Sequence, residues 1–128
     1  MDKIQEILYE MSKDIPGYVA GAVVENEEGL TIVEERNVPD IDIQISAAYS
    51  VEALKFQERV VSALNSNDKA RAIISISGNY LIITQPIGSS NFCLHIITNR
   101  EKSALGIILA LLSKYEQILN KAVSEWVL

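Results

Sequence analysis

The chain has 128 residues, of which 48% are hydrophobic, and this size and composition suit one domain with a buried core. Its formal net charge of -6 argues against nucleic acid and acidic membranes as main partners, because binding to either requires clustered lysine and arginine. The single cysteine, Cys93, allows no internal disulfide and no metal site of its own. We therefore expect a cytoplasmic protein that binds no nucleic acid.

The sequence contains no segment typical of export or of a membrane span. Its start lacks an apolar signal core, and the longest apolar stretch, residues 104–112, is far shorter than the roughly 20 residues of a membrane helix. There is also no internal repeat, low-complexity tract or linker. We therefore predict no membrane insertion and a single domain over residues 1–128.

The first half of the chain predicts a helix, a hairpin and a second helix. Behind Asp2, the predicted N-cap, apolar residues recur at helical spacing until Pro16 and Gly17 end the helix. Residues 18–25 and 30–35 are rich in β-branched side chains, and the turn-forming residues between them indicate a hairpin. After a loop, helical spacing resumes and continues from Ile43 to Leu64 without glycine or proline.

The second half predicts three strands and a last helix. A dense turn at residues 65–68 precedes an alternating segment within residues 70–77, and two further strands follow at 80–87 and 92–98. Asn99 is placed to cap a helix over residues 100–125. The order is helix, two strands, helix, three strands, helix. Two groups of hairpins favour an antiparallel sheet with helices on its faces, an α/β fold of the α+β type.

The helix predicted over residues 43–64 is apolar on two adjacent stripes that together cover well over half of its circumference. One stripe contains Ile43, Ala47, Val51, Leu54 and Val61, and the other contains Ile45, Tyr49, Ala53, Phe56, Val60 and Ala63. Such a helix has two buried faces and needs two partners. Either it lies between the sheet and the last helix, or a second copy of the chain covers the second stripe.

We favour the second copy. The last helix has a broad apolar arc of its own, which includes Ile107 and Ile118, so it can cover the opposite face of the sheet together with the first helix. The small residues Ser46, Ser50 and Ala53 would let two copies of the middle helix approach closely across a twofold axis. We therefore predict a homodimer.

Candidate catalytic and ligand-binding residues are few. His95 and Cys93 alternate within a predicted strand, where such residues are more often part of the core than catalytic. No spacing typical of metal ligands occurs, and the glycine turns connect strand to strand and lack the helix N-terminus of a phosphate loop. We predict a protein that is not an enzyme and needs no cofactor. A further hypothesis is a ligand-sensing or enzymatic domain that uses Cys93 and His95.

The ordered sequence pattern resembles the roadblock family of dynein light chains. The resemblance begins with Ile-Pro-Gly-Tyr-Val-Ala-Gly-Ala-Val-Val at residues 15–24 and Glu-Gly-Leu-Thr-Ile at 28–32. It continues with Ala47-Ala48, with Ile-Ile-Thr-Gln-Pro-Ile-Gly at 82–88 and with Leu105-Gly106. No single motif is specific, and the resemblance rests on their combination with the order and length of the elements.

This resemblance implies a five-stranded antiparallel sheet with the middle helix on one face and the first and last helices on the other. It also implies a dimer formed by the middle helix and the third strand, so that one sheet continues across two chains through the edge at residues 70–77. Pairing would protect an apolar edge strand that is otherwise an association hazard. The predicted dimer interface is Ser46, Tyr49, Ser50, Ala53, Phe56, Gln57, Val60, Ile73 and Ser75.

The family contains subunits of dynein and of scaffolds. It also contains prokaryotic relatives that bind small Ras-like GTPases, and some of these relatives promote GTP hydrolysis. The resemblance therefore implies a non-enzymatic homodimeric regulator or adaptor of a Ras-like GTPase. No catalytic residue transfers from the family, and the solvated side of the middle helix, with Glu52, Lys55 and Arg59, is the predicted GTPase contact. The alternative is a structural scaffold subunit whose binding ignores the nucleotide.

Overall fold

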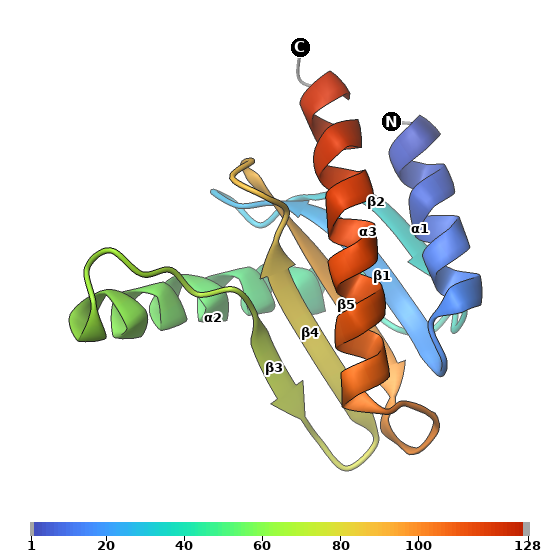
Figure 1. Cartoon of the computed structure of the whole chain (residues 1–128). Helices are drawn as coiled ribbons and strands as arrows, with labels where there is room; N and C mark the ends of the chain where they lie inside the picture. The colour runs from blue at the N-terminus through green and yellow to red at the C-terminus, as the bar shows by residue number, and fades with distance from the viewer. Residues whose placement is uncertain (1, 127–128) are drawn as a thin grey trace.

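The structure is a computed structural model that describes residues 2–126 and contains one antiparallel sheet between two layers of helices (Figure 1). The elements are α1 (Asp2–Asp14), β1 (Tyr18–Glu25), β2 (Thr31–Arg36), α2 (Ile43–Leu64), β3 (Ile73–Ile76), β4 (Tyr80–Pro86), β5 (Phe92–Asn99), the short 3-10 helix η1 (Arg100–Lys102) and α3 (Leu105–Trp126). The predicted order of three helices and five strands is confirmed.

The strands lie in the order β2-β1-β5-β4-β3, and all neighbours are antiparallel. The central strands β1 and β5 are buried almost throughout, which explains why their sequences are nearly continuous apolar runs. Ala22 of β1 lies opposite His95 of β5, and Thr84 of β4 lies opposite the same histidine on its other side. The two edges of the sheet are β2 and β3.

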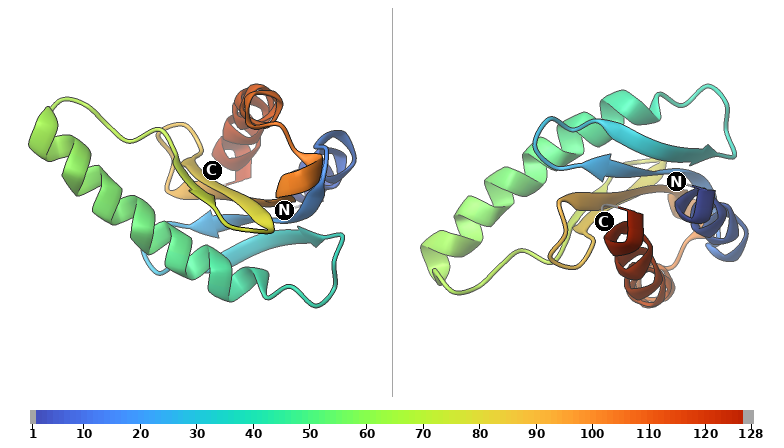
Figure 2. Two further views of the ribbon diagram at one scale, coloured as in Figure 1. Left: turned by 90° about the horizontal axis from the view of Figure 1, so that it is seen from below. Right: turned by 90° about the horizontal axis from the view of Figure 1, so that it is seen from above.

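Helices α1 and α3 cover one face of the sheet and α2 crosses the other, as the views along the layers show (Figure 2). The interpretation that placed the middle helix between the sheet and the last helix is therefore wrong. α2 uses one of its two apolar stripes against the sheet, where Ile43, Ala47, Val51 and Leu54 are buried. They pack on small side chains of β1, including Ala20 and Ala22, which let the helix approach the strands closely.

The end of the chain differs from the prediction. Asn99 caps the 3-10 helix η1, since its side chain accepts a hydrogen bond from the Glu101 amide at 3.0 Å, and the last helix starts only at Leu105. Ser103, between the two, donates to the carbonyls of Pro16 and Asn99 and holds the chain in a non-helical connection. Within residues 2–126, no helix has the length and hydropathy needed to cross a bilayer.

Helix α3 is also less completely buried than its apolar arc predicts. Its contacts with the core are made by Ile108, Leu112, Tyr115, Leu119, Ala122 and Val123. Ile107 and Ile118, which we assigned to the covering arc, are 55% and 41% exposed. The arc is broader than the strip of sheet that the helix covers.

Gly21, in the centre of β1, leaves space for the ring of Tyr18. A Cβ atom at residue 21 would lie 2.5 Å from the Tyr18 hydroxyl and 2.7 Å from Ile96 Cδ1. That hydroxyl donates to the Glu35 carbonyl on β2 at 2.8 Å, so the tyrosine cannot move without losing this bond. We expect Gly21→Ala to lower the free energy of unfolding by ~1–3 kcal/mol, measured by urea denaturation. Gly78→Ala, where a Cβ meets nothing within 4 Å, is the control, and an equal loss in both variants would contradict the steric explanation.

Candidate protein-interaction site

The solvent face of α2 carries the second apolar stripe that the sequence predicts. Tyr49, Phe56 and Val60 are 75%, 61% and 49% exposed, although residues of these types are usually buried. Their spacing of seven and then four residues places them on one side of the helix. Nothing in residues 2–126 covers this stripe.

The stripe adjoins the free edge of β3. Ile73 is half-buried because it packs toward α2, whereas Ser75 and Ile76 are exposed. The C-terminal part of α2 extends past β3, beyond the border of the sheet (Figure 1). We call Tyr49, Phe56, Val60, Ile73 and Ser75 the α2–β3 surface.

The other predicted interface residues lie beside this surface or turn away from it. Ser50, Ala53 and Gln57 are half-buried along the border between the two stripes of α2. Ser46 faces the sheet, where its hydroxyl lies 2.7 Å from His95 Nε2. On α2 and β3, the exposed large apolar residues that the predicted interface omitted are Ile45, Leu64, Ile74 and Ile76. The helical spacing of Ile45 with Tyr49 was the sequence signal that could have added it.

The three charged residues predicted to contact a GTPase differ in how firmly their side chains are held by neighbouring residues. Lys55 is held in place, because its ammonium donates to the Glu27 carbonyl at 3.0 Å and to Glu52 at 3.2 Å, and so ties α2 to the β1–β2 turn. Arg59 is exposed, and its guanidinium lies 5.4 Å from the centroid of the Phe56 ring, within the range of a cation–π contact. Of the three, Arg59 makes no hydrogen bond with residues 2–126 and can turn to meet a partner.

His95 connects α2 to the sheet. Its ring is fully buried, with Nε2 2.7 Å from Ser46 Oγ on α2 and Nδ1 2.8 Å from Thr84 Oγ1 on β4. A neutral ring donates through one nitrogen and accepts through the other, and a hydroxyl can serve either role. Burial lowers the pKa of His95 from 6.5 to about 4, so the ring is neutral at pH 7.

Cys93 lies two residues away on the same face of β5 and is also buried. Burial, with a smaller contribution from the negative charge of Glu58, raises the pKa of the thiol to about 12. A nucleophilic or metal-binding cysteine needs the thiolate, which this environment disfavours. The geometry of Cys93 and His95 is that of core residues, and within residues 2–126 no three His, Cys, Asp or Glu side chains gather as a metal site would require.

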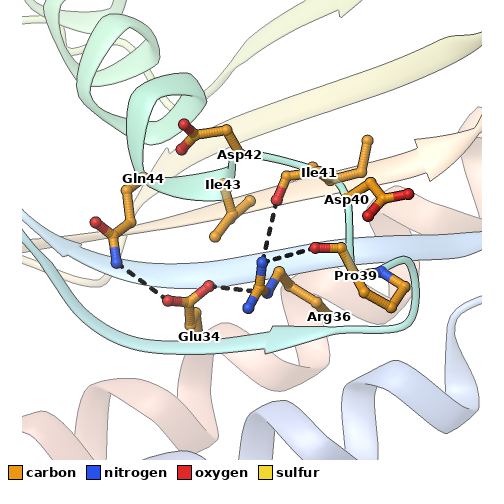
Figure 3. A pocket seen from close by; sticks show the side chains of 8 residues that line it. All are labelled: Glu34, Arg36, Pro39, Asp40, Ile41, Asp42, Ile43 and Gln44. Carbon is orange, nitrogen blue, oxygen red and sulfur yellow. Dashed lines mark hydrogen bonds and ion pairs between the residues drawn. The ribbon is translucent and has the colours of Figure 1, made fainter.

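A polar hollow of about 360 Å³ lies where β2 meets the start of α2 (Figure 3). The Arg36 guanidinium lines it, donating to the Pro39 carbonyl at 2.9 Å and pairing with Glu34 at 3.3 Å. Gln44 of α2 donates to the same Glu34 carboxylate at 3.2 Å. These contacts join β2, the connecting loop and α2, so they hold the start of the helix in position.

Sequence comparison finds no matching protein family and no matching curated protein. Comparison with solved structures finds similar folds. The Roadblock/LC7 domain from Streptomyces avermitilis matches with a TM-score of 0.77 and Myxococcus xanthus MglB with a TM-score of 0.81. Each is 16% identical in sequence to this protein, and each match covers 96% of both chains. A structure of MglB with a tetrameric arrangement has a TM-score of 0.85 at 10% identity and covers 97% of this chain and 90% of that chain. The resemblance to the roadblock family is thus confirmed at the level of structure, and the chain has the Roadblock/LC7 fold over nearly its whole length.

Proposed function

We propose that the protein is a homodimeric regulator of a small Ras-like GTPase and has no catalytic site of its own. The observation that carries the proposal is the α2–β3 surface, an apolar helix stripe beside an unpaired strand edge. MglB, whose fold is similar, has been solved in a tetrameric arrangement, so self-association occurs among proteins of this fold. A twofold axis between the β3 strands of two copies would pair the edges and bring the α2 helices together.

The energetics favour such an arrangement. Burying a tyrosine, phenylalanine or valine side chain contributes ~1.5–3 kcal/mol each relative to leaving it in water. An isologous contact uses each residue twice, so Tyr49, Phe56 and Val60 would supply six buried side chains. Pairing of β3 with its copy would add main-chain hydrogen bonds and remove an edge prone to non-specific association.

The GTPase partner is inferred from the resemblance to the prokaryotic branch of the roadblock family. In the proposed dimer, two copies of Glu52, Lys55 and Arg59 would flank the paired α2 helices and form a charged platform. Lys55 is bonded to the Glu27 carbonyl of the β1–β2 turn and to Glu52, so its side chain would lose little entropy when a partner binds the platform.

The test is to mix the protein with Ras-like GTPases of its own organism, loaded with GDP or with a non-hydrolysable GTP analogue, and to measure binding by calorimetry. We expect binding to one nucleotide state only. Binding that is equal in both states would instead favour the structural scaffold subunit. Failure to bind any such GTPase would overturn the proposal.

A single substitution tests the platform. We expect Arg59→Ala to weaken binding of the GTPase roughly tenfold, because the arginine supplies a mobile charge at the contact. Lys102→Ala, which removes an exposed cation from η1 at the other end of the molecule, is the matched control. If both variants bind as the wild type does, the partner contacts another part of the surface.

A further inference from the structure

Strand β3 carries apolar side chains on both faces of the sheet. Ile73 packs toward α2, so the alternation along the strand turns Ile74 and Ile76 to the face that carries α1 and α3. Their partners on β4, Ile83 and Leu81, are buried in the core on that face. Ile74 and Ile76 themselves are 38% and 60% exposed. The cover that the two helices give to this face therefore ends between β4 and β3 (Figure 1).

The side of α3 that faces β3 is apolar as well. Leu109 lines one cavity together with Ala72, which immediately precedes β3, so this side of the helix is turned toward that strand. Leu105 lies one turn earlier on the same side and is 36% exposed. We call Ile74, Ile76, Leu105 and Leu109 the β3–α3 patch. None of the four is charged, and none is buried by residues 2–126.

The width of the uncovered part of the sheet follows from two general spacings. Neighbouring strands are ~4.8 Å apart and a helix with its side chains is ~10 Å wide, so one helix covers about two strands. α1 lies over β1 and β2, and α3 lies beside α1 and reaches β5, where Trp126 packs against Phe92. With Leu81 and Ile83 of β4 also buried, β3 is the strand that has no helix on this face.

The proposed dimer, on which this inference rests, would double the uncovered part. β3 would lie beside its copy, and a twofold axis perpendicular to the sheet keeps both β3–α3 patches on one face. The strip without a helix is then two strands wide, ~10 Å, which is the width of one helix. The two β3 strands form its floor and the two α3 helices form its sides.

The chemistry of the strip selects its occupant. In the dimer both β3 strands are paired on both edges, so the strip offers side chains and no main-chain groups. An extended segment lying on it would hold unpaired peptide groups against an apolar surface, whereas a helix satisfies its own. Because the β3–α3 patch has no charge, the side of the helix in contact with it must be apolar, while the other side faces water.

We propose that the dimer binds one amphipathic helix of a partner protein in this strip, on the face opposite the paired α2 helices. A single helix that lies across a twofold axis excludes a second one, so the stoichiometry is one helix per dimer. The site requires the dimer but is independent of the GTPase, whose predicted contacts lie on α2.

The probe is a capped peptide of about 18 residues with leucine at helical spacing on one side and glutamate and lysine elsewhere. It is added to the full chain, and nuclear magnetic resonance follows the methyl groups of Ile76 and Leu105. We expect saturable shifts of both that are complete at one peptide per dimer. A peptide of the same composition, with its leucines spread around the helix, should give no saturable shift.

Two variants test the floor and the side of the strip separately. Ile76→Lys places a charge on the floor and should weaken binding at least about tenfold. Leu105→Lys changes the side, leaves β3 intact and should weaken binding to a similar degree. Ile107→Lys, at an exposed isoleucine on the other side of α3, is the matched control and should bind as the wild type does.

Light scattering on the same samples separates this proposal from that of the dimer. A dimeric wild type that gives no saturable shift, or that binds two peptides, overturns the helix site alone, whereas a monomeric wild type overturns the dimer and the helix site together. Equal weakening by Ile107→Lys, or none by the two strip variants, would also contradict the site. A tetrameric wild type that Ile76→Lys converts to a dimer would show that a second dimer covers the strip instead.

Discussion

Replacing both Tyr49 and Phe56 with glutamate is expected to convert a dimer into a monomer of 14.2 kDa. The two substitutions remove four large side chains from a twofold interface and place four carboxylates there. Burial of an unpaired charge costs several kcal/mol, and the lost apolar burial adds ~1.5–3 kcal/mol for each side chain. The dissociation constant should therefore rise by at least about a thousandfold.

This variant should stay folded, because both side chains are exposed in the single chain. Light scattering after gel filtration measures the mass, and circular dichroism checks the fold. Ile107→Glu with Ile118→Glu is the matched control, since it adds the same charge at exposed apolar positions of α3 on the other face of the sheet. A monomeric wild type, or a double variant that remains dimeric, would show that the α2–β3 surface does not form the interface.

Stability should fall steeply as the pH drops from about 6.5 to about 4, because of His95. The folded protein keeps the ring neutral down to a pKa of about 4, whereas the unfolded chain binds a proton below 6.5. Between these values the unfolded state holds more protons, so acid favours unfolding, and below about 4 this effect is complete. The difference in pKa corresponds to a loss of ~3 kcal/mol. Above pH 6.5 the contribution of His95 does not change with pH.

The substitution His95→Leu separates this effect from the titration of carboxylates, which is common to both proteins. At pH 7 we expect the variant to be less stable by ~2–4 kcal/mol, because the Ser46 and Thr84 hydroxyls lose their partner. The wild type loses stability toward pH 4 through protonation of His95, and the variant does not. The difference in free energy of unfolding between the two proteins should therefore become smaller as the pH falls. Urea denaturation at one protein concentration and at several pH values measures it. A gap that stays constant from pH 7 to pH 4 would contradict the assignment.

The prediction of the fold succeeded where local pattern and burial agree. The spacing of apolar residues in α2 gave its bounds, Ile43–Leu64, and its two stripes, because helix periodicity is a property of the chain alone. The bounds of β3 were predicted less accurately. Its ladder with β4 is only four residues long, whereas the alternation in the sequence continues beyond it. The start of α3 was wrong because Asn99 is an effective cap for either kind of helix, and the contacts of Ser103 decide between them.

By itself, the sequence determined the order of the elements, the antiparallel sheet and the presence of an apolar stripe that one sheet cannot cover. Tertiary structure decided which stripe faces solvent, because that depends on where α2 crosses the sheet and not on its periodicity. It also decided the roles of single polar residues. Ser46 of α2 and Thr84 of β4 come together at His95 of β5. Such contacts join residues distant in the chain, so no local pattern encodes them.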